Sequence, residues 1–360
     1  MPFKYKRIAL KIGSNVLTRP DSTLDITRMS ALVDQIAFLH KKGVEVVLIS
    51  SGAVASGRSI LGINRKMDEL DQRQLYSAVG QAKLINHYWD LFRDHGITVG
   101  QVLTTKENFS SRRHYLNQRN CMQVMLDNKV IPIVNENDTV SVSELMFTDN
   151  DELSGLIASM MDMQALILLS NIDGIYDGSP DDPASKIIKR IEKDQEVGQF
   201  MYAGRSSFGR GGMATKVNIA RKIADQGIEV YIANGKRDNV LVELLDRDGD
   251  PQCTRFVPAV GTVSSVKKWI AHSQGFSKGE VHVNANAAIA LTGEKAVSLL
   301  PVGVTEIRGD FEKDEIVKII DDKGHLLGMG KVQYSSEKAR EVLGKKNNKP
   351  LIHCDYLYIG

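Results

Sequence analysis

The sequence predicts an α/β protein, a three-layer αβα sandwich with a mainly parallel central sheet, followed by a small β-rich domain. Up to about residue 235, short apolar runs alternate with helical patterns, and several of these runs lack the in/out alternation of a half-exposed sheet. From residue 275 onwards, short strand-like runs are separated by Gly and Asp-Asp-Lys-Gly turns. Strands that alternate with helices indicate a parallel sheet covered on both faces.

Six apolar runs are expected to form the strands of the parallel sheet. In chain order they are "RIALKI" (7–12), "VEVVLIS" (44–50), "ITVGQVL" (97–103), "KVIPIV" (129–134), "ALILLS" (165–170) and "IEVYIA" (228–233). The segment 26–43 is typical of the helices between them, because Met29, Leu32, Val33 and Ile36 recur at helical spacing and Gly43 supplies a stop.

The length of 360 residues favours two domains. The change from alternating strand and helix patterns to short strand-like runs predicts an αβ domain at residues 1–255, a linker at 256–275 and the β-rich domain at 276–360. Apolar residues make up 42% of the chain and charged residues 25%, which suits a protein able to bury a sizeable core.

Charge and targeting patterns exclude some classes of protein. The chain has 46 Lys and Arg against 44 Asp and Glu, which argues against nucleic-acid binding through bulk charge. We expect a cytoplasmic protein, because the start has no signal-peptide cleavage pattern and no uncharged run is long enough to cross a bilayer. Three cysteines, far apart in sequence and without metal-ligand spacing, suggest reduced thiols.

Small or polar residues follow directly after several of the predicted strands. In parallel sheets, ligands bind beyond the carboxyl ends of the strands. One edge of the sheet is therefore expected to carry groups that bind phosphate or charge, namely Lys11, Gly13 and Ser14; Ser50, Ser51 and Gly52; residues 135–138; and Ser170, Asn171 and Asp173.

Two acidic segments, "NEND" (135–138) and "DNDE" (149–152), contain no Lys or Arg. Their carboxylates need positive partners from elsewhere. One candidate is Lys11, which ends a buried strand before a Gly-Ser turn and is expected to face an anion, although a lysine on an edge strand would give the same pattern.

A glycine-rich stretch, "SSFGRGGMATK" (206–216), supplies the second candidate, Lys216. "GRGGMA" formally fits a dinucleotide fingerprint, but no strand leads directly into it. We expect a loop that feeds a helix beginning near Ala214, with backbone N–H groups and Lys216 binding polyphosphate; a surface loop without a ligand is the alternative. The chain has neither a GxxxxGK[ST] loop nor the HRD and DFG signatures of protein kinases.

Several motifs together resemble a known family. "LKIGSNVL", "ISSGAVASG", "LDNKVIPIVNENDTV", "DNDELSGLIA", "LLSNIDGIYD" and "GRGGMATK", in this order and spacing, are similar to the glutamate 5-kinases of the amino-acid kinase family, and the tail resembles a PUA domain. The resemblance covers essentially the whole chain. It implies ATP-dependent phosphorylation of the γ-carboxylate of L-glutamate, the first step of proline biosynthesis, with Mg²⁺ and with no metal ligand from protein side chains.

The resemblance also implies roles for individual residues. Lys11 and Lys216 would flank the migrating phosphoryl group, and Asp151 would hold both ammonium groups. The residues matching the glutamate-binding positions are Ser51, Gly52, Asp138 and Asn150. Those matching the nucleotide-binding positions are Lys11, Gly13, Ser14, Ser170, Asn171, Arg210, Gly211, Gly212, Met213, Ala214, Thr215 and Lys216. Family members more often carry Asp at position 171 and Thr at position 210, so these two departures concern nucleotide binding.

Two other functions stay open from the sequence. One is another amino-acid kinase, acting on aspartate or a related acid. The other is RNA binding, because PUA domains occur in RNA-modifying proteins, but residues 276–360 contain 12 basic and 12 acidic residues. The resemblance further suggests feedback inhibition by proline and a homo-oligomer, a dimer or tetramer. The strength of the feedback, the oligomeric state and the role of the tail do not follow from the sequence.

Overall fold

The computed structural model describes residues 3–63, 67–140, 147, 149–180, 182–193, 195, 212–259, 265–271, 277–293, 296–346 and 348–359. The chain forms two compact units, of which the first comprises residues 1–108 and 113–262 and the second residues 109–112 and 263–360. The residues expected to form a linker, 256–275, are thus divided between the two units.

The described strands of the first unit form an eight-stranded sheet in the order β3-β4-β2-β1-β5-β7-β8-β6. Neighbouring strands run parallel except β7 and β8, which are antiparallel. The strands are β1 (Arg7–Ile12), β2 (Glu45–Ser50), β3 (Val99–Thr104), β4 (Ile131–Glu136), β5 (Ala165–Ser170), β6 (Arg190–Ile191), β7 (Glu229–Asn234) and β8 (Cys253–Phe256). The six expected strands are all present; β8 and the two-residue β6 were not expected.

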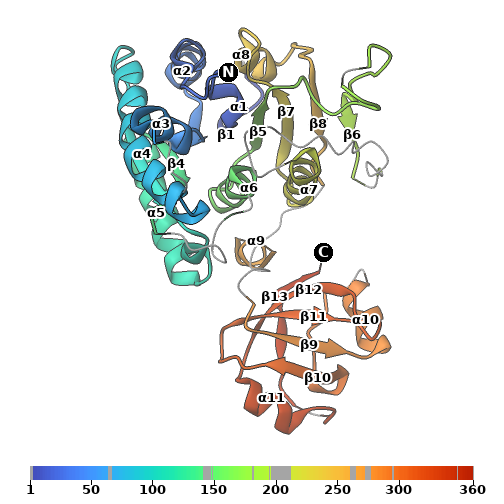
Figure 1. Cartoon of the computed structure of the whole chain (residues 1–360). Helices are drawn as coiled ribbons and strands as arrows, with labels where there is room; N and C mark the ends of the chain where they lie inside the picture. The colour runs from blue at the N-terminus through green and yellow to red at the C-terminus, as the bar shows by residue number, and fades with distance from the viewer. Residues whose placement is uncertain are drawn as a thin grey trace. The chain divides into compact units, whose positions relative to one another are not determined.

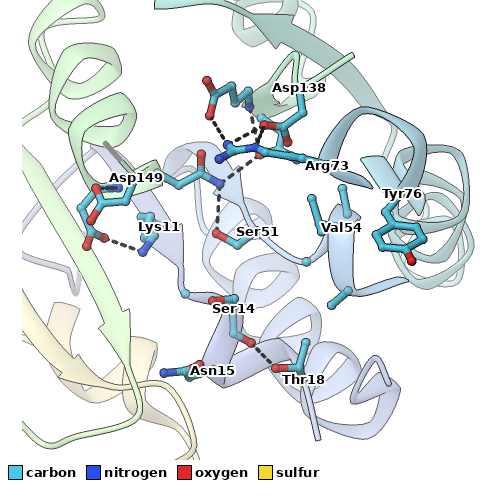
Figure 2. A pocket seen from close by; sticks show the side chains of 18 of the residues that line it. Lys11, Ser14, Asn15, Thr18, Ser51, Val54, Arg73, Tyr76, Asp138 and Asp149 are labelled. Atoms are coloured by element: carbon cyan, nitrogen blue, oxygen red, sulfur yellow. Dashed lines mark hydrogen bonds and ion pairs between the residues drawn. The ribbon is translucent and has the colours of Figure 1, made fainter. Parts of the chain in front are cut away.

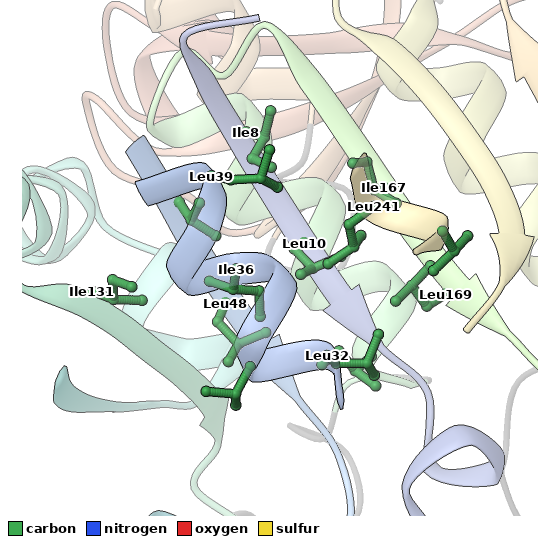
Figure 3. Close-up of a cluster of buried hydrophobic side chains, with 14 of the residues drawn as sticks. Ile8, Leu10, Leu32, Ile36, Leu39, Leu48, Ile131, Ile167, Leu169 and Leu241 are labelled. Atoms are coloured by element: carbon green, nitrogen blue, oxygen red, sulfur yellow. The ribbon is translucent and has the colours of Figure 1, made fainter. Parts of the chain in front are cut away.

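Helices cover both faces of this sheet, which confirms the predicted three-layer sandwich (Figure 1). On one face, α2 (Ile26–Lys41) and α8 (Val240–Leu245) pack against alternate residues of the central strands. Figure 3 shows this core, with Ile8 of β1 beside Leu39 of α2. On the other face, α6 (Asn150–Met160) packs on β1 and β5, and α7 (Met213–Ala224) packs on β7.

Two further helices, α3 (Ala53–Leu61) and α4 (Glu69–Arg93), pack closely together. A Cβ atom on Gly80 of α4 would lie 1.8 Å from the carbonyl oxygen of Ala53, and one on Gly57 of α3 would lie 1.8 Å from that of Tyr76. The two backbones can approach this closely only because both positions are glycine. The unit also contains α1 (Ser14–Leu17) and most of the 3-10 helix η1 (Lys106–Phe109) and of α5 (Arg112–Asp127).

The second unit has its own five-stranded sheet, in the order β10-β9-β11-β12-β13, around its own apolar core. All neighbours are antiparallel except β9 and β11. Its elements are α9 (Ser265–Ala271), β9 (Gly279–Val283), α10 (Ala285–Thr292), η5 (Pro301–Gly303), β10 (Val304–Gly309), β11 (Ile316–Ile320), β12 (Leu326–Val332), α11 (Ser336–Val342) and β13 (Ile352–Ile359). The expectation of a small β-rich domain is confirmed.

Within the part of the chain that the structure describes, no helix combines the length and the apolar character needed to cross a membrane.

Candidate functional site

A cavity of about 510 Å³ opens where the carboxyl ends of β1, β2, β4 and β5 meet, the edge of the sheet at which the sequence places its polar residues. Segments that are distant in sequence meet here (Figure 2). The sequence-predicted residues that line it are Lys11, Gly13, Ser14, Ser51, Gly52, Asp138, Asn150, Asp151, Ser170, Asn171 and Lys216.

Two lysines share one buried carboxylate in this cavity. Lys11 Nζ lies 2.5 Å from Asp151 Oδ1, and Lys216 Nζ lies 2.7 Å from Asp151 Oδ2. The Asp151 side chain is 1% exposed, against 6% for Lys11 and 13% for Lys216. Burial alone would raise the pKa of Asp151, but the two ammonium charges outweigh it and hold this pKa at about 2. The carboxylate is therefore ionised, and the trio carries a net positive charge.

Local structure explains how these three side chains meet. Side chains alternate along a strand, so Lys11 points away from the core that contains Leu10 and Ile12 and towards the face covered by α6. Asp151 lies in the first turn of α6, and Lys216 in the first turn of α7. Helix α7 begins at Met213, one residue before the expected start near Ala214.

Asp149 is a second, partly buried carboxylate, which the sequence analysis named within the acidic segment 149–152 but gave no role of its own. It caps α6, since its Oδ1 accepts hydrogen bonds from the backbone N–H groups of Asp151 (2.9 Å) and Glu152 (3.1 Å). Its Oδ2 is buried without a hydrogen-bond partner among the described residues. Burial and the negative charge of Asp151 raise the pKa of Asp149 to about 6. This oxygen lines the cavity as an unused acceptor next to the lysine pair.

Asn150 joins the ends of two strands to the start of α6. Its Nδ2 lies 3.0 Å from Ser51 Oγ, 3.2 Å from the Ser50 carbonyl oxygen and 3.0 Å from Asn135 Oδ1. Asn135 in turn donates to Gln81 Oε1 of α4 at 2.9 Å. Gly52, which follows Ser51, has a φ of 107°, a conformation that other residues rarely adopt. These contacts hold the turn that follows β2 next to the two acidic segments.

Arg73 of α4 is a site residue that the sequence analysis missed. Its Nε donates to Asp138 Oδ1 at 2.6 Å and its Nη2 donates to Glu136 Oε2 at 2.8 Å (Figure 2). Glu136 Oε1 also accepts a hydrogen bond from the backbone N–H of Phe147. The only available sequence signal is the spacing of Arg73, Ser77 and Gln81, which puts a row of polar residues on one face of a helix.

The nucleotide-binding candidates are brought together in part. Gly13 donates its N–H to the Leu169 carbonyl oxygen at 3.0 Å, and a Cβ on Gly13 would lie 3.0 Å from the same oxygen. Gly212 caps the start of α7. The described residues that line the cavity do not include Gly212, Met213, Ala214 or Thr215, and Arg210 and Gly211 lie outside the described part of the chain.

Among the described residues, the one group of three potential ligands within reach of a single ion is His353, Cys354 and Asp355 in β13 of the second unit. The cavity itself contains no such group among the residues described.

Comparisons with family models and with known proteins agree on one family. A model of the amino acid kinase family matches residues 6–234, and a PUA domain model matches residues 279–352. The chain is 68% identical to a glutamate 5-kinase of Bacteroides thetaiotaomicron, over 100% of both chains. It is 45% identical to one of Chlorobaculum tepidum, covering 99% of this chain and 98% of the relative. A solved isopentenyl phosphate kinase has a TM-score of 0.49 at 18% identity, covering 70% of this chain and 100% of that chain. The family model and the full-length relatives show that the chain belongs to the amino acid kinase family and, within it, to the glutamate 5-kinases that carry a PUA domain.

Proposed function

We propose that the protein transfers the γ-phosphoryl group of ATP to the γ-carboxylate of L-glutamate and so forms L-glutamyl 5-phosphate, the first intermediate of proline biosynthesis. The observation that carries this proposal is the pair of lysines on one buried carboxylate in a cavity that also holds the acidic segments. The full-length glutamate 5-kinase relatives support the choice of acceptor.

Phosphoryl transfer depends mainly on positioning and on cations around the negative charge of the migrating group. Lys11 and Lys216 supply two ammonium groups on opposite oxygens of Asp151. A glutamate side chain is already ionised at neutral pH, so the acceptor needs no general base. Asp151 serves as a positioning residue, because its two oxygens are taken up by the lysines.

ATP is the phosphoryl donor expected of a kinase of this family. We propose that it binds across Gly13, Ser14, Ser170 and Asn171, which line the cavity beside the lysines. Mg²⁺ prefers oxygen ligands and commonly binds through substrate phosphates. We propose that the ion arrives with the nucleotide, where it would supply neutralisation of phosphate charge.

We propose that glutamate binds at the other end of the cavity. Its α-ammonium suits Asp138, and Ser51, Gly52 and Asn150 suit its carboxylates through hydroxyl, backbone and amide donors. Arg73 donates a hydrogen bond of 2.6 Å to Asp138, and this contact holds the Asp138 carboxylate in one orientation at the proposed glutamate site.

A trapping assay tests the proposed function directly. The purified protein is incubated with ATP, Mg²⁺ and either L-glutamate or L-aspartate, and hydroxylamine converts the acyl phosphate to a coloured hydroxamate. We expect product with glutamate. Turnover of aspartate but not of glutamate would overturn the assignment in favour of another amino-acid kinase.

Three further proposals follow from membership of this family and extend beyond the site geometry. We propose proline as a feedback inhibitor, a homo-oligomeric assembly, and a cytoplasmic location, which suits the three free cysteines. Proline titration of the hydroxamate assay and light scattering of the purified protein test the first two. The equal numbers of basic and acidic residues in the tail do not favour RNA binding. A gel shift on the whole chain at physiological salt tests for such binding.

A further inference from the structure

The contact between α4 and the end of β4 is built from one arginine and two carboxylates. Arg73 reaches Asp138 and Glu136 with two different nitrogens, at 2.6 and 2.8 Å. The side chains of Glu136 and Asp138 are 3% and 7% exposed, and that of Arg73 is 19% exposed. All three residues line the cavity. A planar guanidinium that bridges two carboxylates fixes their orientation in a way that a single ammonium cannot.

This cluster offers carboxylate oxygens to a ligand in the cavity. Arg73 faces two carboxylates at the cavity wall, so carboxylates outnumber guanidinium groups among these three side chains. An ammonium group of a ligand would meet carboxylate oxygens that Arg73 has already oriented. Two carboxylates without Arg73 would instead repel each other, so their oxygens would lose the orientation that an ammonium group needs.

The backbone that carries Arg73 is held firmly. Gly80, two turns further along α4, lies against the carbonyl of Ala53 in α3, and the side-chain Oε1 of Gln81 accepts a hydrogen bond from Asn135 Nδ2 in β4. Helix α4 therefore presents Arg73 to the acidic segment from a fixed position. This arrangement is poorly suited to an arginine that must swing away to admit a substrate.

We propose that Arg73 is a positioning residue that holds Asp138 and Glu136 ready for the α-ammonium group of the acceptor, and that it thereby selects acceptors with an α-amino group. The inference rests on the proposed function and deepens it. It assigns amino-group recognition to a side chain of α4 that does not itself bind the ammonium, since a guanidinium is a donor only.

Two other roles for Arg73 make different predictions. If Arg73 competed with the ammonium for Asp138, its removal would strengthen glutamate binding. If Arg73 only stabilised the fold, its removal would weaken every ligand of the acceptor site equally. An analogue that lacks only the amino group, glutarate, separates these roles.

The experiment compares wild-type protein with Arg73→Gln and Arg73→Lys in the hydroxamate assay, with glutarate as a competitive inhibitor. We expect Arg73→Gln to raise the KM for glutamate by about tenfold or more, with kcat changed by less than about threefold. The Ki of glutarate should change by less than about threefold, because glutarate offers no ammonium group. Arg73→Lys should restore part of the loss, since it keeps the charge without the fork geometry.

Controls separate this effect from damage to the helix. Arg93→Gln removes an arginine from the exposed end of the same helix, where it pairs with Asp90, and should leave both constants unchanged. Asp138→Asn should raise the KM for glutamate, and the double variant with Arg73→Gln should be little worse, because both changes disable one contact. Thermal unfolding of each variant shows whether it is folded.

Equal weakening of glutamate and glutarate in Arg73→Gln would overturn the inference, and so would a lower KM for glutamate. If the wild-type protein forms no hydroxamate from glutamate, the proposed function itself is overturned. The wild-type assay comes first, so this outcome is known before any variant is compared.

Discussion

The ammonium group of Lys11 lies 2.5 Å from a carboxylate oxygen of Asp151, and both side chains are almost excluded from solvent. Lys216 contacts the other oxygen of the same carboxylate. One negative charge thus holds two positive ones, and the surplus charge faces the cavity. A buried group with this balance is expected to favour a strongly anionic ligand such as a polyphosphate.

Asp151→Asn tests the dependence of the site on this carboxylate. The substitution keeps the shape of the side chain but leaves two mostly buried ammonium groups without a counter-charge. We expect the free energy of unfolding to fall by about 3 kcal/mol in urea titrations. Asp162→Asn, which breaks a half-exposed pair with Arg119, should cost less than about 1 kcal/mol. Equal losses in the two variants would contradict the reasoning.

Lys11→Ala and Lys216→Ala are expected to lower kcat by at least about a hundredfold, because each removes a cation that stabilises the migrating phosphoryl group. Glutamate should still bind, which calorimetry on the variants can measure. Lys189→Ala removes an exposed lysine that pairs with Asp250 and serves as the control with unchanged kcat. Loss of glutamate binding together with turnover would place the lysines at the acceptor instead.

In Asp138→Ala we expect the KM for glutamate to rise, with a smaller effect on kcat. The variant loses the carboxylate that we assign to the α-ammonium, while Arg73 keeps its contact with Glu136. Steady-state kinetics with varied glutamate measure the effect. An unchanged KM for glutamate would mean that the ammonium binds elsewhere.

The raised pKa of Asp149 predicts a specific pH dependence of stability. Its carboxyl has a pKa of about 6 in the folded protein, against an ordinary value of 3.8, so the folded state binds the proton more tightly. The resulting stabilisation is fully present below about pH 4 and is lost as the pH rises through about 6. Asp149→Asn removes this titration and keeps a side chain that can cap α6.

We therefore expect the Tm difference between Asp149→Asn and wild type to move in favour of the variant as the pH rises from 4 to about 7. Thermal unfolding at intervals across that range measures the difference. A difference that is constant over the range would show that Asp149 does not titrate there.

Gly80→Ala should destabilise the protein even though alanine is the better helix former. Its Cβ would lie 1.8 Å from the Ala53 carbonyl oxygen, so α3 and α4 must move apart. We expect a loss of about 1–3 kcal/mol in the free energy of unfolding and a higher KM for glutamate, because α4 carries Arg73. Gly293→Ala, whose added Cβ meets nothing closer than 3.4 Å, is the matched control and should change neither quantity by much.

Local sequence patterns predicted most of the fold but few of the contacts in the site. The apolar runs at 7–12 and 165–170 identify buried parallel strands because their composition leaves little alternative. The four-residue strand Cys253–Phe256 was not expected, since so short a run carries no periodic signal and is defined by its pairing with β7 and β6. Asp149 was named as part of an acidic segment but not as a helix cap, because its capping role depends on where α6 begins.

The sequence by itself determined the layered fold, the polar edge of the sheet and the lysines and acidic segments that gather there, because strand and helix periodicity and strand-end composition are local properties. The family resemblance implied that Asp151 holds Lys11 and Lys216, a contact that the local patterns do not contain and that the structure describes. Only the tertiary structure decided that Arg73 supplies the cation for the first acidic segment. Those pairings depend on how α4, α6 and α7 pack on the sheet. Packing of that kind depends on distances between segments that are far apart in the chain, and spacing within a single segment does not record them.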